Sequence, residues 1–227
     1  MNNKSSLSIL FLGKNDDYCN KALKFVNENF ENVASYLGKW GDPLPEDIGW
    51  WKGDYIISYL SRWIVPVSLI NRSKRAINFH PGSPSYPGVG CYNFALYENA
   101  LEYGVTCHHM HKNVDTGNII AVKRFPVFPT DDVSSLLSRT YDFQLALFYE
   151  IIGKIIISED LPLSTEKWER KPFSRKELNE LSTITPDMSN AEIKKRIRAT
   201  NYMQFKPTVF LGKYIFELKT INNDEIT

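Results

Sequence analysis

Short apolar runs alternate with helix-like segments over the first 160 residues, and this alternation constrains the fold more than any other feature. Residues 8–13 form an almost continuous apolar run ending in glycine, and residues 54–60 form a second one. Both are typical of buried strands. Between them, residues 18–30 carry apolar side chains at helical spacing. Strands that alternate with helices predict an α/β fold around a mostly parallel sheet.

The same pattern continues toward residue 160. Strands are expected at residues 76–80, 104–110 and 119–128, and helices at 66–71 and 92–102. Thr130-Asp131-Asp132 predicts a helix start, with a hydroxyl at the N-cap and acids in the first turn. Apolar residues from Val133 to Ile155 then recur at helical spacing, so the longest helix should pack on the sheet.

After residue 160, prolines break the chain into short pieces. We therefore expect one domain at residues 1–160 and a small C-terminal region at 161–227 with a helix and a β-hairpin. The helix is predicted at 189–199 with Ser189 as its cap. The hairpin, at 208–218, should turn at Gly212-Lys213. An apolar hairpin of this kind predicts a contact between subunits, and so a homodimer.

Bulk composition narrows the class of protein. The 227 residues carry a net charge of +1, so no strong general field favours nucleic acid or an anionic membrane. The basic run 194–198 is either a local patch or a solvated helix face. The three cysteines lie far apart without CxxC spacing and read as reduced thiols. No leader or membrane-spanning segment is expected, so we predict a soluble, cytoplasmic protein without nucleic-acid or membrane partners.

The block Asn78-Phe79-His80-Pro81-Gly82 carries the first candidate chemistry. On a strand, residues two apart face the same side, so Asn78 and His80 should project together. Pro81 and Gly82 place them at the carboxyl end of the strand, the edge where open α/β sheets bind ligands. A lone histidine at such a place is more often structural, but a neighbouring amide weakens that interpretation.

A second block, Val114-Asp115-Thr116-Gly117, offers a carboxylate in a tight turn. An Asn, a His and an Asp in one cleft can polarise a carbonyl and move a proton, and one of them can adjust the pKa of the group that carries this proton. Asn78, His80 and Asp115 are therefore the predicted catalytic residues.

The run Cys107-His108-His109-Met110-His111 suggests a metal site, because Cys107, His109 and His111 would share one face of a strand. A rise of about 3.3 Å per residue spreads three alternate positions over roughly 13 Å, too far for one ion. We therefore expect no metal and favour a half-buried strand with polar tips.

The blocks NxHP at 78–81, GVTxH at 104–108 and DTGxII at 115–120 together resemble the signature of folate-dependent formyltransferases. The loop 82–90 is most similar to that of the nucleotide-sugar N-formyltransferase branch, since the Ser-Leu-Leu-Pro stretch of other branches is absent. The resemblance implies a Rossmann-like domain and N10-formyltetrahydrofolate as the donor. It leaves open whether His80 or Asp115 removes the proton from the attacking amine.

The resemblance also implies the ligand contacts. The pterin of the donor would lie against the backbone of residues 61–64, and residues 111–115 would border its other side. The implied folate-binding residues are Ser61, Arg62, Trp63, Ile64, His111, Asn113 and Asp115. Arg62 faces the folate, pairs with a diphosphate or is an ordinary surface arginine. Tyr202 could donate to a phosphate and Phe205 could stack on a base, although aromatic residues in such a segment more often pack.

The implied activity is formyl transfer to the amine of a nucleotide-linked amino-dideoxysugar, for O-antigen or another surface polysaccharide. The expected acceptor is dTDP-4-amino-4,6-dideoxyglucose. One alternative is a small amino-nucleotide such as glycinamide ribonucleotide. Another is a non-catalytic module that binds folate or a sugar nucleotide.

Overall fold

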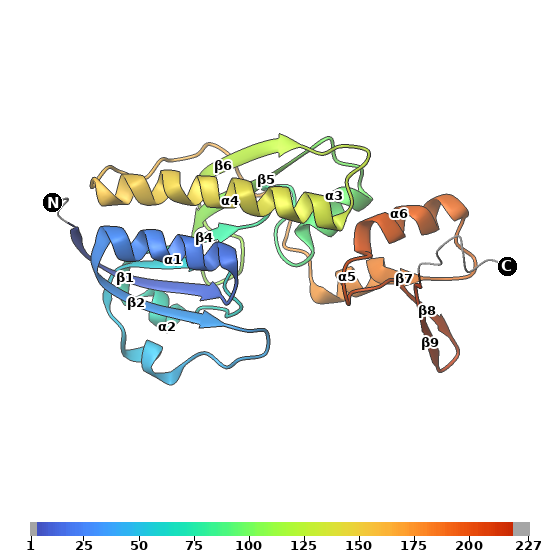
Figure 1. The fold of residues 1–227 in the computed structure, drawn as a ribbon, viewed down its shortest axis with the longest axis horizontal. Helices are drawn as coiled ribbons and strands as arrows, with labels where there is room; N and C mark the ends of the chain where they lie inside the picture. Colours follow the sequence, from blue (N-terminus) through green and yellow to red (C-terminus); the bar gives the residue numbers. More distant parts are fainter. Residues whose placement is uncertain (1–3, 220–227) are drawn as a thin grey trace.

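A six-stranded sheet in the order β2-β1-β3-β4-β5-β6 forms the centre of the protein (Figure 1). The structure, a computed structural model, describes residues 4–219. The strands are β1 (Ser5–Lys14), β2 (Phe30–Gly38), β3 (Gly53–Tyr59), β4 (Ser73–His80), β5 (Glu102–His109) and β6 (Ile119–Pro126). The first four strands are parallel, and β5 runs antiparallel to both β4 and β6. The predicted α/β fold with a mostly parallel sheet is confirmed.

Helices cover both faces of this sheet, which explains the continuous apolar runs of its strands. The helices α1 (Asp17–Asn29) and α4 (Val133–Ile156) lie along one face (Figure 1). On that side the ring of Phe148 contacts Phe79 at 5.1 Å between centroids. The short η1 (Glu46–Trp50) and α2 (Val67–Ile70) bury a second core, built on alternate residues of β1 with one residue each from β3 and β4. Among residues 4–219, no helix is both long and apolar enough to cross a lipid bilayer.

Three local features differ from the expectations. Strand β2 follows α1 directly and was not anticipated, because its mixed burial gives no apolar run. The helix α3 (Cys91–Tyr97) is shorter than the predicted 92–102, and Asn99 with φ of 54° leaves the helical conformation soon after its end. The N-cap of α4 is Asp132, whose carboxylate accepts from the Ser135 amide at 2.9 Å, so the predicted Thr130 cap is wrong.

The C-terminal region packs on α3 through its own helix. It contains α5 (Arg175–Ser182), β7 (Thr183–Ile184), α6 (Asn190–Thr200), β8 (Thr208–Leu211) and β9 (Tyr214–Glu217). Ser189 caps α6, and β8 and β9 form a hairpin through Gly212-Lys213, so both predictions are confirmed. The Asn93 amide of α3 donates to the Ala199 carbonyl of α6 at 2.6 Å, which joins the two units.

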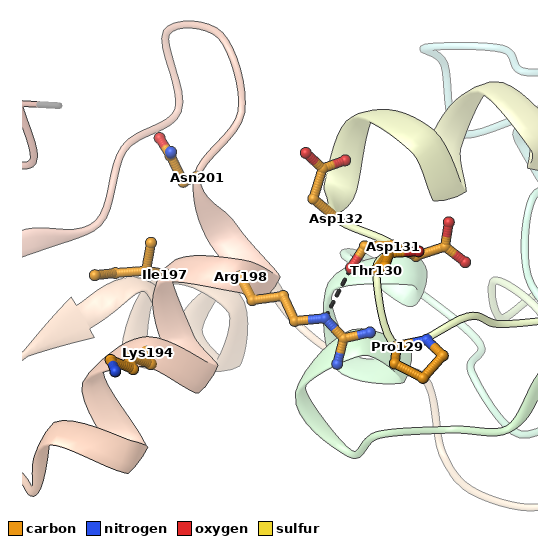
Figure 2. Close-up of a pocket in the computed structure, with 8 residues that line it drawn as sticks. All are labelled: Pro129, Thr130, Asp131, Asp132, Lys194, Ile197, Arg198 and Asn201. Atoms are coloured by element: carbon orange, nitrogen blue, oxygen red, sulfur yellow. Dashed lines mark hydrogen bonds between the residues drawn. The ribbon is translucent and has the colours of Figure 1, made fainter. Parts of the chain in front are cut away.

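Arg198 forms a second joint between α6 and the main sheet unit. Its Nε donates to the carbonyl of Asp131 at 2.7 Å, and both residues line the cavity of about 360 Å³ that Figure 2 shows. Nearby, Arg196 pairs with Glu192 at 2.6 Å. Both arginines of the basic run 194–198 therefore serve internal contacts rather than a free patch.

Candidate active site

Asn78 and His80 point to one face at the carboxyl end of β4, opposite Phe79. His80 is buried, and its Nε2 lies 2.9 Å from the carbonyl oxygen of Tyr86. A carbonyl only accepts, so Nε2 carries a proton. Its Nδ1 lies 3.2 Å from Oδ2 of Asp115, a second acceptor. Both ring nitrogens therefore face acceptors, which is the contact pattern of a doubly protonated imidazole.

Asp115 is held in the turn that follows β5, with a left-handed φ of 48°. Its carboxylate is buried and accepts the Gly88 amide at 2.8 Å. Burial alone would raise the pKa of this carboxyl. The charge of His80, the hydrogen bond and charge of His108 and the Gly88 amide outweigh burial, and together they lower the pKa of Asp115 to about 2.

His108 completes the cluster, and our sequence analysis missed it. In the antiparallel pair β4–β5, His108 lies directly opposite Asn78. Its Nε2 is 3.1 Å from the Asn78 amide nitrogen and 3.3 Å from Oδ1 of Asp115. Its Nδ1 donates to the His109 carbonyl at 2.8 Å. Nε2 can therefore accept from Asn78 or, once protonated, donate to Asp115.

The sequence did contain a signal for His108, because the GVTxH block ends on it. We considered instead the alternate residues Cys107, His109 and His111, which the structure separates. Cys107 is buried in the core, and His111 is exposed in the following loop. Within residues 4–219, no group of three or more His, Cys, Asp or Glu side chains is arranged to hold a metal ion.

The loop after His80 is anchored, which holds the imidazole in place. Thr106 of β5 donates to the Gly82 carbonyl at 2.7 Å, and Tyr103 donates to the Pro81 carbonyl at 2.7 Å. A Cβ on Gly82 would lie 2.4 Å from Nε2 of His80, so only glycine fits beside the ring. These contacts fix the loop that follows His80.

The other predicted site residues lie at the rims. Arg62 and Ile64 are exposed after β3, whereas the indole of Trp63 packs on Gly38 and donates to the Asp42 carbonyl at 3.0 Å. The Ser61 hydroxyl accepts from the Trp63 amide at 3.2 Å.

His111 and Asn113 are exposed in the loop that leads to Asp115. In the C-terminal region, Tyr202 and Phe205 bond to each other through their backbones at 2.8 Å. Phe205 is 60% exposed.

A second polar group brings together ends of elements that are distant in the sequence. We call it the Lys14 cluster; its members are Lys14, Arg62, Tyr92, Tyr141 and Tyr202. Lys14 Nζ donates to the Tyr141 hydroxyl at 2.9 Å and pairs with Asp16 at 2.7 Å. Burial raises the pKa of the Tyr92 and Tyr141 phenols. The positive charge of Arg62 opposes this rise at both phenols, and Tyr202 adds to it.

Comparison with known proteins shows that the chain is similar to formyltransferases. The sequence pattern of the formyl transferase family matches residues 47–152, which include all four clustered residues. The GDP-perosamine N-formyltransferase of Brucella melitensis is 30% identical over 158 residues, which cover 69% of this chain and 60% of that protein. Over residues 47–152 the chain is similar to the formyl transferase family. The match thus spans about 60% of the length of this relative.

Solved structures of formyltransferases share the fold. A 4-N formyltransferase from Francisella tularensis superposes with a TM-score of 0.74 at 19% identity, covering 94% of this chain and 99% of its own. An N-formyltransferase from Helicobacter canadensis, solved with folinic acid and dTDP-3-aminofucose, gives a TM-score of 0.70 at 23% identity. The superposition covers 85% of this chain and 80% of the Helicobacter chain. The superposition on the Francisella structure includes the C-terminal region, because it covers 94% of this chain.

Proposed function

We propose that this chain transfers a formyl group from N10-formyltetrahydrofolate to the amine of a nucleotide-linked amino-dideoxysugar. The observation that carries the proposal is the buried, hydrogen-bonded cluster of Asn78, His80, His108 and Asp115 within the stretch that matches the family. A Brucella relative named for GDP-perosamine, and a Helicobacter neighbour bound to folinic acid and an amino-sugar nucleotide, support this choice of substrates.

The chemistry requires stabilisation of a negative oxygen. The acceptor amine attacks the formyl carbon, a C–N bond forms, and charge develops on the former carbonyl oxygen. Both nitrogens of His80 already face protein acceptors, so the direct donor to this oxygen is the half-buried amide of Asn78. When it is protonated, His80 adds positive charge to the same site.

The proton balance assigns a role to Asp115. The attacking nitrogen loses one proton, and N10 of the donor gains one as its bond to the formyl carbon breaks. A carboxyl with a pKa of about 2 is a weak base. The ammonium of a tetrahedral intermediate is a stronger acid than a free alkylammonium, and Asp115 only relays its proton toward N10 of the donor without retaining it. We assign the relay to Asp115, and to His108, which contacts both Asp115 and Asn78.

The donor and acceptor would approach from different sides. We place the pterin between the backbone of residues 61–64 and the loop 111–115, as the family resemblance implies. The acceptor phosphates would bind the Lys14 cluster, where a lysine, an arginine and three phenols provide donors. Among the described residues, Arg62 has no ion-pair partner, and Phe205 is exposed and free to stack on a base.

One incubation tests the activity. The protein, N10-formyltetrahydrofolate and a panel of amine acceptors are combined, and mass spectrometry records the gain of one formyl group. The panel contains dTDP-4-amino-4,6-dideoxyglucose, a dTDP-linked 3-amino sugar, a GDP-linked amino sugar and glycinamide ribonucleotide. We expect formylation of the dTDP-linked 4-amino sugar, as a step toward a surface polysaccharide. Formylation of glycinamide ribonucleotide alone would favour the amino-nucleotide alternative, and no gain on any amine would refute the enzyme.

The variant His80→Asn separates an enzyme from a binding module. An enzyme should lose turnover while keeping its affinity for the folate and the sugar nucleotide, measured by calorimetry. A module that only binds would show no turnover in the unmodified protein either.

We also propose that the protein is a homodimer joined through the β8–β9 hairpin. This hairpin exposes Tyr214, Ile215 and Phe216 by 53–62%, and Figure 1 shows it projecting from the body. In the described part of the chain, β9 pairs with β8 alone and leaves one edge open. The same strand of a second copy can pair with that edge around a twofold axis. Sedimentation of the protein and of Ile215→Lys tests this, with a dimer expected to become a monomer.

A further inference from the structure

Residues 161–173, which we call the strap, have no regular secondary structure but are bonded to both loops of the candidate site. The Glu169 amide donates to the Pro84 carbonyl at 3.1 Å, and the Phe173 amide donates to the Pro87 carbonyl at 3.0 Å. Near its start, the Ser164 amide donates to the Ile119 carbonyl at 3.3 Å, at the beginning of β6. The strap therefore joins the loop that follows His80 to the segment that follows Asp115.

Trp168 is the residue of the strap that reaches the clustered histidines. Its ring lies 5.1 Å from the ring of His108 and 5.8 Å from that of His80, in edge-to-face arrangements. Its indole N–H donates to the Gly117 carbonyl at 2.8 Å. One side chain thus touches both imidazoles that flank Asp115 and the turn that carries Asp115.

The turn that carries Asp115 and Gly117 is strained and tightly packed. Asp115 has a left-handed φ of 48°, a conformation that costs energy for any residue but glycine. Gly117 packs so tightly that a Cβ would lie 1.8 Å from the His109 carbonyl oxygen. The bond from Trp168 fixes the carbonyl at the end of this turn, so it restrains the direction of the Asp115 carboxylate.

Packing of the indole adds an electrostatic effect. Asp115, His80 and His108 are each at most 4% exposed, and an aromatic ring on the histidines keeps water away from them. Exclusion of water strengthens the contacts between the carboxylate and the imidazoles.

We propose that Trp168 is a positioning residue for formyl transfer, which aligns Asp115 with His80 and His108 through its bond to Gly117 and its contacts with both rings. The inference rests on the proposed function only for its kinetic readout. Trp168 does not have to touch either substrate. Its effect therefore belongs to the rate of the chemical step rather than to substrate binding.

Two variants separate the parts of this role. Trp168→Phe keeps an aromatic ring and removes the N–H donor, whereas Trp168→Leu removes both. Phe173→Leu is the matched control, since Phe173 stacks on Phe94 at 3.7 Å and stabilises the same strap without touching either histidine. All three are compared with the wild type for kcat, for KM of both substrates and for melting temperature.

We expect Trp168→Phe to lower kcat by about 10-fold and to change each KM by less than about 2-fold. Trp168→Leu should lower kcat further. Phe173→Leu should lower the melting temperature while its kcat stays within about 2-fold of the wild type. The proposal is wrong if Trp168→Phe retains wild-type kcat, or if Phe173→Leu lowers kcat as much as Trp168→Phe does.

A second measurement does not depend on the activity. Nitrogen-15 NMR of the histidine rings reports which ring nitrogens are protonated and how they are hydrogen-bonded. Trp168→Phe should shift the signals of His80 and His108, and Phe173→Leu should leave them in place. Unchanged ring signals in Trp168→Phe would overturn the positioning role. A wild-type protein without transferase activity would instead refute the proposed function.

Discussion

Asn78 and His108 face each other across the antiparallel pair β4–β5, with 3.1 Å between the amide nitrogen and Nε2. His108 also lies 3.3 Å from Asp115, so it links the amide to the carboxylate. Without His108, Asn78 would have no recorded contact with the other two predicted catalytic residues. The candidate site is therefore a connected group of four residues rather than a trio.

His108→Ala should lower kcat by about 100-fold, because both the Asn78 amide and the Asp115 carboxylate lose a partner. Steady-state kinetics with the formylated acceptor measures the effect. His109→Ala is the matched control, since His109 is adjacent in sequence but is not part of the cluster. Equal losses in the two variants would contradict the role of His108.

Asn78→Ala should lower kcat by roughly 100- to 1,000-fold with little change in KM, as expected for loss of one donor to a developing oxyanion. Asn118→Ala changes an exposed asparagine and should keep wild-type kinetics. A rise in KM at constant kcat would instead make Asn78 a binding residue.

Arg62→Ala should raise the KM of the sugar nucleotide several-fold and leave the KM of the folate unchanged, if Arg62 binds the acceptor phosphates. Arg72 is an exposed arginine whose guanidinium lies 5.7 Å from the Trp50 ring, so Arg72→Ala is a control. An increase confined to the KM of the folate would assign Arg62 to the donor.

Gly117→Ala should destabilise the protein by about 2 kcal/mol or more, because a Cβ would lie 1.8 Å from the His109 carbonyl oxygen. Gly153→Ala provides the opposite case within α4, where a Cβ would meet no atom within 4 Å. It should stabilise the protein by about 0.5–1 kcal/mol. Urea denaturation measures both free energies of unfolding.

The pH dependence of stability should reveal the depressed pKa of Asp115. Its pKa is about 2 in the folded protein, against an ordinary value of 3.8. The stabilising contribution is therefore complete above about pH 4 and is lost as the pH falls toward 2. The difference in free energy of unfolding between the wild type and Asp115→Asn should shrink by on the order of 2 kcal/mol over that range. A difference that stays constant to pH 2 would contradict the assignment.

Much of the fold could be predicted from local patterns. The buried strands, the long helix from Val133 and the hairpin at Gly212-Lys213 each follow from a few neighbouring residues. Strand β2 could not be predicted this way, because its mixed burial produces no clear period. Three consecutive polar residues, 130–132, could each have capped α4. Asp132 is the one with the extended backbone of an N-cap, which the sequence pattern did not reveal.

The sequence alone determined that Asn78 and His80 share a face at the end of a strand, and that Asp115 lies in a turn. Those relationships involve residues close in the chain, where backbone geometry dictates direction. Only the tertiary structure decided that His108, rather than Cys107 or His109, faces Asn78, because pairing register is a property of two strands. It also brought Trp168 to a turn 51 residues earlier in the chain, since such a contact arises only when the strap packs against the folded sheet.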